Sequence, residues 1–104
     1  MTEYEIVKLL HDLGIKEHLR GFKYLVDSIL LFQENDLIED IYTVISKEYN
    51  INKYNVERSI RYTIERSFNY KLTLNLFNLD YNKDKPTNKE FIYTISKRLK
   101  NNWK

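Results

Sequence analysis

The chain has 104 residues, of which 42% are apolar and 31% are charged, with a formal net charge of +2; this size predicts a single domain over residues 1–104. Cysteine is absent, which excludes disulfides, thiolate zinc sites and a cysteine nucleophile. No apolar run approaches the roughly 18 residues of a membrane span and no signal peptide precedes the first charges, so we exclude membrane and secreted proteins and expect a cytoplasmic one.

The composition favours helices, because two glycines and one proline leave little for the tight turns of an all-β fold. The first predicted helix covers about residues 2–13, beginning with a Thr2–Glu5 capping box and ending at the first glycine. The second covers about residues 22–34. Its apolar residues form a set too broad for one stripe, so we expect this helix to be central and buried.

The third and fourth predicted helices are separated by only a few residues. The third begins after Asn35 or Asp36, either of which is a suitable N-cap, and keeps an apolar period of 3.6 up to Tyr49. The fourth covers about residues 53–68, with Asn52 as its N-cap. Two helices joined in this way have the dimensions of a helix-turn-helix.

The remaining predicted elements lie in the basic C-terminal third. A short helix is predicted around residues 72–79, although the alternating apolar residues there also fit a strand. Residues 81–86 are predicted to form a polar, basic loop. The last helix begins with a second capping box, Thr87 with Glu90, and extends to about Asn102.

Helical spacing divides the fourth predicted helix into two sides. The side expected to face the core contains Val56, Ile60, Thr63, Ile64 and Ser67. The opposite side carries long polar side chains, namely Tyr54, Asn55, Arg58, Arg61, Tyr62 and Glu65. Arginine pairs with guanine and asparagine with adenine in the DNA major groove, and each good pair discriminates by about 1–3 kcal/mol. This second side therefore has the chemistry of a DNA recognition helix.

The same residues also fit an ordinary solvated helix face. Arg61 lies four residues after Glu57 and four before Glu65, which is the spacing of surface ion pairs worth a few tenths of a kcal/mol. Helix-turn-helix spacing also occurs in many helical bundles. Both interpretations remain open on these residues alone.

Charge is distributed unevenly along the chain. Residues 1–50 hold five Lys and Arg against ten Asp and Glu, whereas residues 51–104 hold twelve against five. A basic half is typical of a nucleic-acid interface, but solvated helix faces produce the same imbalance. Lys83, Lys85 and Lys89 have the same two interpretations, as phosphate contacts near a helix N-terminus or as part of a solvated loop.

Four stretches of the chain are more specific than this spacing. They are Leu13-Gly14-Ile15, then H-L-R-G-F-K-Y-L over 18–25, V-E-R-S-I-R over 56–61 and K-P-T-N-K-E-F-I over 85–92. Together they resemble the C-terminal DNA-binding effector domain of the sporulation master response regulator of endospore-forming bacteria, whose patterns include H-(I/L)-(K/R)-G-(Y/F) and K-P-T-N-x-E-F-I. The resemblance covers nearly the whole chain.

The resemblance implies a fold and a function. It implies a compact, all-α, six-helix bundle in which helices three and four form the helix-turn-helix. It also implies bacterial transcription regulation through TGTCGAA-like boxes in double-stranded DNA, as tandem or dimeric units, with contact to RNA polymerase or its sigma factor. The regulator's receiver domain is not expected in these residues, so the chain is either an excised effector domain or a stand-alone protein.

The predicted DNA-binding residues combine this resemblance with the helical spacing. Base and backbone contacts of the V-E-R-x-I-R core carry over to Glu57, Arg58 and Arg61, and contacts of the lysine-rich stretch before P-T-N carry over to Lys83 and Lys85. The complete predicted set is Lys53, Asn55, Glu57, Arg58, Arg61, Tyr62, Lys83 and Lys85.

Three departures from the family pattern predict an altered site preference. Asn55 stands where the family usually has arginine, which removes a guanine contact and favours adenine. Tyr62 replaces a histidine after the R-x-I-R core. The segments beside Leu76-Phe77 are a few residues shorter, which affects the backbone contacts expected from those loops.

No enzyme is expected, because the sequence has only two histidines and no metal-binding, phosphate-loop or nucleophile motif. We therefore predict no catalytic residue, cofactor or metal. The nine tyrosines are scattered over the helices, which favours packing over stacking on single strands. Two other functions stay open: a plasmid or phage DNA-organising protein, and a protein-docking module that uses the acidic residues Glu34, Asp36, Glu39 and Asp40.

Overall fold

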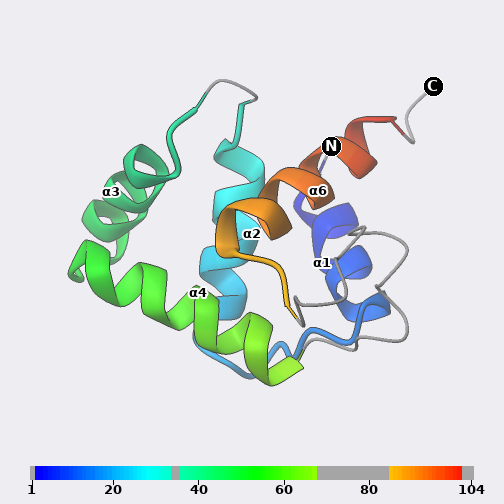
Figure 1. The fold of residues 1–104 in the computed structure, drawn as a ribbon, viewed down its shortest axis with the longest axis horizontal. Coiled ribbons are helices and arrows are strands. Elements are labelled where there is room, and N and C mark those ends of the chain that lie inside the picture. Colours follow the sequence, from blue (N-terminus) through cyan, green and yellow to red (C-terminus); the bar gives the residue numbers. More distant parts are fainter. Residues whose placement is uncertain (1, 34–35, 68–84, 102–104) are drawn as a thin grey trace.

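The computed structural model describes residues 2–33, 36–67 and 85–101, and over these residues all regular secondary structure is helical (Figure 1). Its helices are α1 (Glu3–Asp12), α2 (Gly21–Leu31), α3 (Ile38–Tyr49), α4 (Lys53–Ser67) and α6 (Asn88–Asn101). The all-α class is thereby confirmed. Five helices rather than the expected six are described, because the short helix expected over 72–79 lies outside the described residues, as does most of the loop expected over 81–86.

Both predicted capping boxes are present. In α1 the Glu5 backbone N–H donates to Thr2 Oγ1 over 3.3 Å, and the Thr2 N–H donates to Glu5 Oε1 over 3.2 Å. In α6 the corresponding distances between Glu90 and Thr87 are 3.1 Å and 2.8 Å. Each box gives partners to backbone N–H groups that a helix start leaves unpaired.

The connection from α2 to α3 differs from the prediction. α2 ends at Leu31, earlier than expected, and α3 begins at Ile38 without a side-chain cap. Asp36 Oδ2 instead accepts the Gln33 backbone N–H at 2.8 Å. The prediction that Asp36 caps α3 is therefore wrong, because its short side chain bonds the nearer donor in the preceding turn. The other candidate cap, Asn35, lies outside the described residues.

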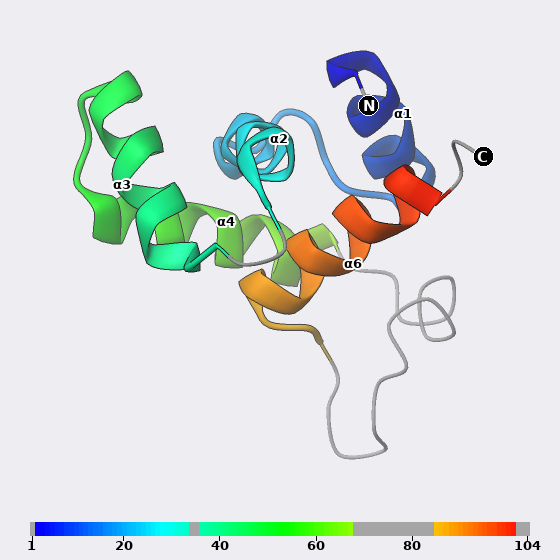
Figure 2. The same cartoon turned by 90° about the horizontal axis from the view of Figure 1, so that it is seen from above.

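α2 occupies the middle of the molecule and contacts each of the other four described helices. Figure 2 shows α2 almost end-on, with α3 on one side and α1 on the other. Most of its side chains are buried, including Phe22, Tyr24, Leu25, Val26 and Ile29. Burying one such side chain stabilises the fold by about 1.5–3 kcal/mol. The prediction of a central, buried second helix is confirmed.

α6 closes the core from the C-terminal side. Its side chains Phe91, Ile92 and Ile95 are fully buried, and it contacts both α2 and α4. The core therefore holds α4 by one side only, which leaves the other side of that helix to solvent. In the part of the chain that the structure describes, no helix is long and apolar enough to cross a membrane.

Candidate nucleic-acid interface

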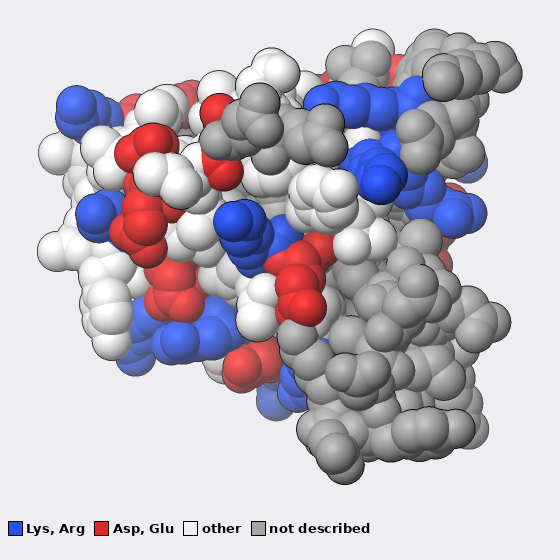
Figure 3. Space-filling view, turned by 45° about the horizontal axis from the view of Figure 1, so that its top comes forward, with Lys and Arg blue, Asp and Glu red and all other residues white. Residues whose placement is uncertain are grey.

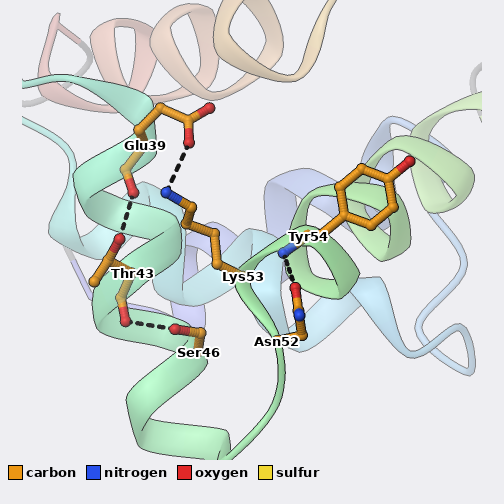
Figure 4. A network of polar contacts seen from close by, with 6 residues as sticks. All are labelled: Glu39, Thr43, Ser46, Asn52, Lys53 and Tyr54. Carbon is orange, nitrogen blue, oxygen red and sulfur yellow. Dashed lines mark hydrogen bonds and ion pairs between the residues drawn. The ribbon is translucent and has the colours of Figure 1, made fainter.

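α3 and α4 pack against each other and are joined by residues 50–52. Asn50 ends α3 in the left-handed conformation, with φ 54° and its N–H donated to the Ser46 carbonyl. Asn52 then begins α4, because its Oδ1 accepts the Tyr54 backbone N–H at 2.7 Å (Figure 4). The two asparagines thus end one helix and begin the next within three residues, and the predicted N-cap at Asn52 is confirmed.

The two predicted sides of α4 agree with the observed burial. The five residues expected to face the core are all buried, namely Val56, Ile60, Thr63, Ile64 and Ser67. The six residues expected on the opposite side are all exposed, namely Tyr54, Asn55, Arg58, Arg61, Tyr62 and Glu65. We call these six residues the outward face of α4.

Two contacts organise the side chains on the outward face. Arg61 Nη1 lies 3.1 Å from Glu57 Oε1, so the half-buried Glu57 carboxylate orients this guanidinium. The Arg58 guanidinium lies 5.5 Å from the centroid of the Tyr54 ring, within the range of a cation–π contact. The expected surface pair between Glu57 and Arg61 therefore exists, whereas Glu65 makes no ion pair with Arg61.

Lys53, at the start of α4, is held by the acidic first turn of α3. Its Nζ lies 3.3 Å from Glu39 Oε2 (Figure 4). The acidic and basic halves of the sequence therefore meet in space at this point. In Figure 3 acidic and basic side chains are interspersed over the α3 side, and basic ones gather on the side of α1 and α6.

Of the two loop lysines in the predicted site, Lys85 is among the described residues and Lys83 is not. Lys85 Nζ donates to the Glu65 carbonyl of α4 over 3.0 Å. This contact places Lys85 beside the C-terminal half of α4, where the last carbonyls of a helix lack partners within the helix. Lys83 lies outside the described residues.

Asn88 connects the start of α6 to both helices of the helix-turn-helix. Its Nδ2 donates to the Tyr42 hydroxyl of α3 and to the Glu57 carbonyl of α4, in each case over 3.0 Å. Asn88 and Tyr42 are both buried. Burial raises the pKa of Tyr42 to about 12, although the hydrogen bond from Asn88 opposes that shift.

A groove of about 610 Å³ runs beside the outward face. One of its sides is formed by predicted site residues, namely Asn55, Arg58, Arg61 and Tyr62. The other side comes from the beginning of α2 and the residues before it, including Leu19, Arg20 and Tyr24. None of the residues on this second side belongs to the predicted DNA-binding set.

The sequence model of the family described as sporulation initiation factor Spo0A C terminal matches residues 6–99. The chain belongs to this family. The Spo0A C-terminal domain is an all-α, DNA-binding domain of a sporulation response regulator and is not a known enzyme family. The resemblance drawn from the four stretches is thereby confirmed, and DNA binding is established at the level of the Spo0A C-terminal family.

Two of the stretches that carry the Spo0A resemblance have clear structural roles. In K-P-T-N-K-E-F-I, Thr87 and Glu90 cap α6, and Asn88 ties it to α3 and α4. In H-L-R-G-F, a Cβ added to Gly21 would lie 2.1 Å from the Ser59 carbonyl oxygen, so only glycine allows α2 to approach α4 this closely. Within the described residues, no group of three or more potential metal ligands occurs.

Proposed function

We propose that the chain is a transcriptional regulator that binds double-stranded DNA sequence-specifically, with α4 in the major groove. One observation carries the proposal beyond the family level: all six residues of the outward face are exposed, while the five on the opposite side are buried. A helix held in this way offers its polar side chains to base edges without loss of core packing.

The side chains have distinct proposed roles. Arg58 and Arg61 pair with guanine, and Glu57 accepts from cytosine while it orients Arg61 through their 3.1 Å contact. Asn55 pairs with adenine, and Tyr62 contacts a neighbouring base or sugar. Because an ion pair engages only some of the five donors of a guanidinium, Arg61 keeps donors for DNA.

The lysines are proposed as phosphate contacts, which position a protein on DNA without distinguishing bases. Lys53 and Lys85 lie at opposite ends of α4, paired with Glu39 and with the Glu65 carbonyl. Both are exposed, so each ammonium group is accessible to a DNA phosphate. Lys83 belongs to the proposed set through the family's lysine-rich stretch alone.

Further parts of the proposal concern organisation and partners. We propose that residues 1–104 form one domain and that the chain binds tandem sites as a homodimer. Contact with RNA polymerase or its sigma factor is proposed from the family resemblance.

A selection from randomised duplexes tests the altered site preference. Because Asn55 stands in place of an arginine, the selected site is expected to differ from the family's TGTCGAA box at one position, with adenine favoured over guanine. Recovery of the unmodified box as the best site would contradict this assignment of Asn55.

Fluorescence anisotropy with the selected duplex and a shuffled duplex tests the proposed function as a whole. Arg58→Gln is expected to reduce the preference for the selected duplex on the order of 10- to 100-fold. Lys8→Gln is the matched control, because it also removes one exposed positive charge but lies on α1. If the unaltered chain binds neither duplex at low salt, the proposal fails and the protein-docking alternative is favoured.

A further inference from the structure

The groove beside the outward face lies next to a close approach of α2 to α4. Gly21, the first residue of α2, is buried against the Ser59 carbonyl and the Thr63 hydroxyl of α4. Arg20 directly precedes this glycine, so the contact fixes the Arg20 backbone beside α4. The groove therefore has Arg20, a cation from outside the helix-turn-helix, on one side and the face proposed to contact DNA on the other.

The α4 side of the groove includes a row of residues along the helix, beside Ser59, Arg61 and Thr63. Asn55, Arg58, Tyr62 and Glu65 follow one another at spacings of three, four and three residues, which places them in one row. The groove therefore runs lengthwise along α4. A helix in the major groove is flanked by sugar-phosphate strands, so a groove along such a helix can accept one of them.

The lining suits a sugar-phosphate strand. The lining includes the apolar or aromatic residues Leu19, Tyr24 and Ile51 and the arginines Arg20, Arg58 and Arg61. Glu65 is the acidic residue of the lining. The groove thus combines a net positive charge with apolar surface on which a deoxyribose can pack.

Arg20 itself is available for a ligand. Its side chain is exposed, and it makes no ion pair within the part of the chain that the structure describes. It also makes no side-chain capping bond to α2. A guanidinium in this situation presents a planar set of donors that matches the oxygens of a phosphate.

We propose that Arg20 is a DNA phosphate contact and that the groove between α2 and α4 holds one sugar-phosphate strand. This inference rests on the proposed function and extends it, because it adds a contact from outside the helix-turn-helix. A phosphate contact carries no base information. Arg20 therefore contributes to affinity for every duplex, whereas the outward face of α4 determines which duplex is preferred.

The test compares Arg20→Gln, Arg20→Lys and Lys8→Gln by anisotropy with the selected and the shuffled duplex between about 50 and 200 mM salt. Each phosphate contact contributes about 0.9 to the slope of log affinity against log salt. Arg20→Gln is expected to lower that slope by about 0.9 and to leave the ranking of duplexes unchanged. Arg20→Lys is expected to keep most of the slope, and Lys8→Gln to keep all of it.

A second measurement locates the contact on the DNA. Single phosphates of the selected duplex are replaced in turn by neutral methylphosphonates. One replacement is expected to weaken binding by the unaltered chain and to have no further effect on Arg20→Gln. If Arg20→Gln is insensitive to the replacement of one phosphate only, Arg20 contacts that phosphate directly. A general effect of charge would change the sensitivity to every replacement.

The outcomes separate the two proposals. If the unaltered chain binds the selected duplex and Arg20→Gln has the same salt slope, the inference is overturned and the proposed function stands. An equal loss in Lys8→Gln would also overturn the inference, because it would show a non-local charge effect. If the unaltered chain shows no DNA binding, both proposals fail. Thermal unfolding of each variant checks that the substitution leaves the fold intact.

Discussion

Gly21 shows how a single residue determines the arrangement of two helices. A methyl group there would meet the backbone oxygen of Ser59 at 2.1 Å and the Thr63 hydroxyl oxygen at 2.3 Å. The Ser59 oxygen belongs to the backbone of α4 and cannot rotate away, so α2 and α4 would have to separate. Close contact at this residue therefore maintains both the core and the groove beside the outward face.

Gly21→Ala is expected to destabilise the fold by about 1–3 kcal/mol, the usual range for an overpacked core position. The higher helix propensity of alanine, worth up to about 1 kcal/mol, would offset only part of that loss. Urea unfolding followed by circular dichroism measures the difference. A variant as stable as the unaltered chain would show that α2 and α4 are not in close contact.

Tyr42 predicts a dependence of stability on alkaline pH. Burial raises its pKa from 10.0 to about 12, so the unfolded chain loses the hydroxyl proton before the folded chain does. The stabilisation from the neutral hydroxyl is complete below pH 10 and is lost as the pH rises toward 12. The folded protein should therefore lose stability over this interval.

Tyr42→Phe is expected to cost about 1 kcal/mol at neutral pH, because it removes one buried hydrogen bond from Asn88. Between about pH 10 and 12 its stability should fall less steeply than that of the unaltered chain. Tyr49, whose hydrogen bond to Asp27 also raises its pKa, is present in both proteins and serves as a common background. Urea midpoints measured at a series of pH values provide the comparison, and parallel curves would contradict the account.

At the scale of elements, the turn between α3 and α4 determines how the recognition helix begins. Asn50 has a φ of 54°, a left-handed conformation that costs most residues with a Cβ roughly 1–2 kcal/mol. Asparagine tolerates this conformation better than most residues, and glycine adopts it without strain. The turn therefore depends on the identity of one residue.

A pair of substitutions at Asn50 tests this dependence. Asn50→Ala is expected to lower the free energy of unfolding by about 1 kcal/mol, whereas Asn50→Gly is expected to leave it nearly unchanged. The two variants both lack the asparagine side chain, so their difference reports the backbone conformation. Thermal denaturation distinguishes them, and equal losses would indicate that the side chain matters rather than the left-handed backbone.

The helices and the two sides of α4 could be predicted because they depend on local patterns. Capping boxes at Thr2 and Thr87, and the 3.6-residue period of α4, are properties of neighbouring residues in the sequence. The failure at Asp36 has a local cause as well, since two nearby backbone donors compete for one short carboxylate and the sequence does not rank them.

The second side of the groove could not be predicted in this way. Arg20 lies 35 residues before Asn55 in the sequence, and their proximity depends on the packing of α2 against α4. The available signal was Gly21, a glycine at the start of a helix instead of after its end. The hydrogen bonds from Asn88 to Tyr42 and Glu57 are equally non-local, and the local pattern at this stretch indicated only the capping box of Thr87 with Glu90.

At the scale of the whole molecule, the net charge of +2 conceals the local charges that matter for DNA. Acidic residues of α3 lie next to the basic start of α4, as the pair of Glu39 with Lys53 shows. Affinity for DNA is therefore expected to depend on a few positioned cations rather than on the overall field of the protein. We propose that DNA is bound by the cations along the outward face of α4 and the adjoining groove.

The most direct test is an NMR titration of the isotope-labelled chain with the selected duplex, in which backbone and side-chain shifts are followed residue by residue. The proposed DNA interface predicts that the largest changes occur at Asn55, Arg58, Arg61 and Tyr62, with a further change at Arg20 and none of similar size on α1. Changes confined to the acidic first turn of α3, or spread evenly over all surface cations, would contradict it.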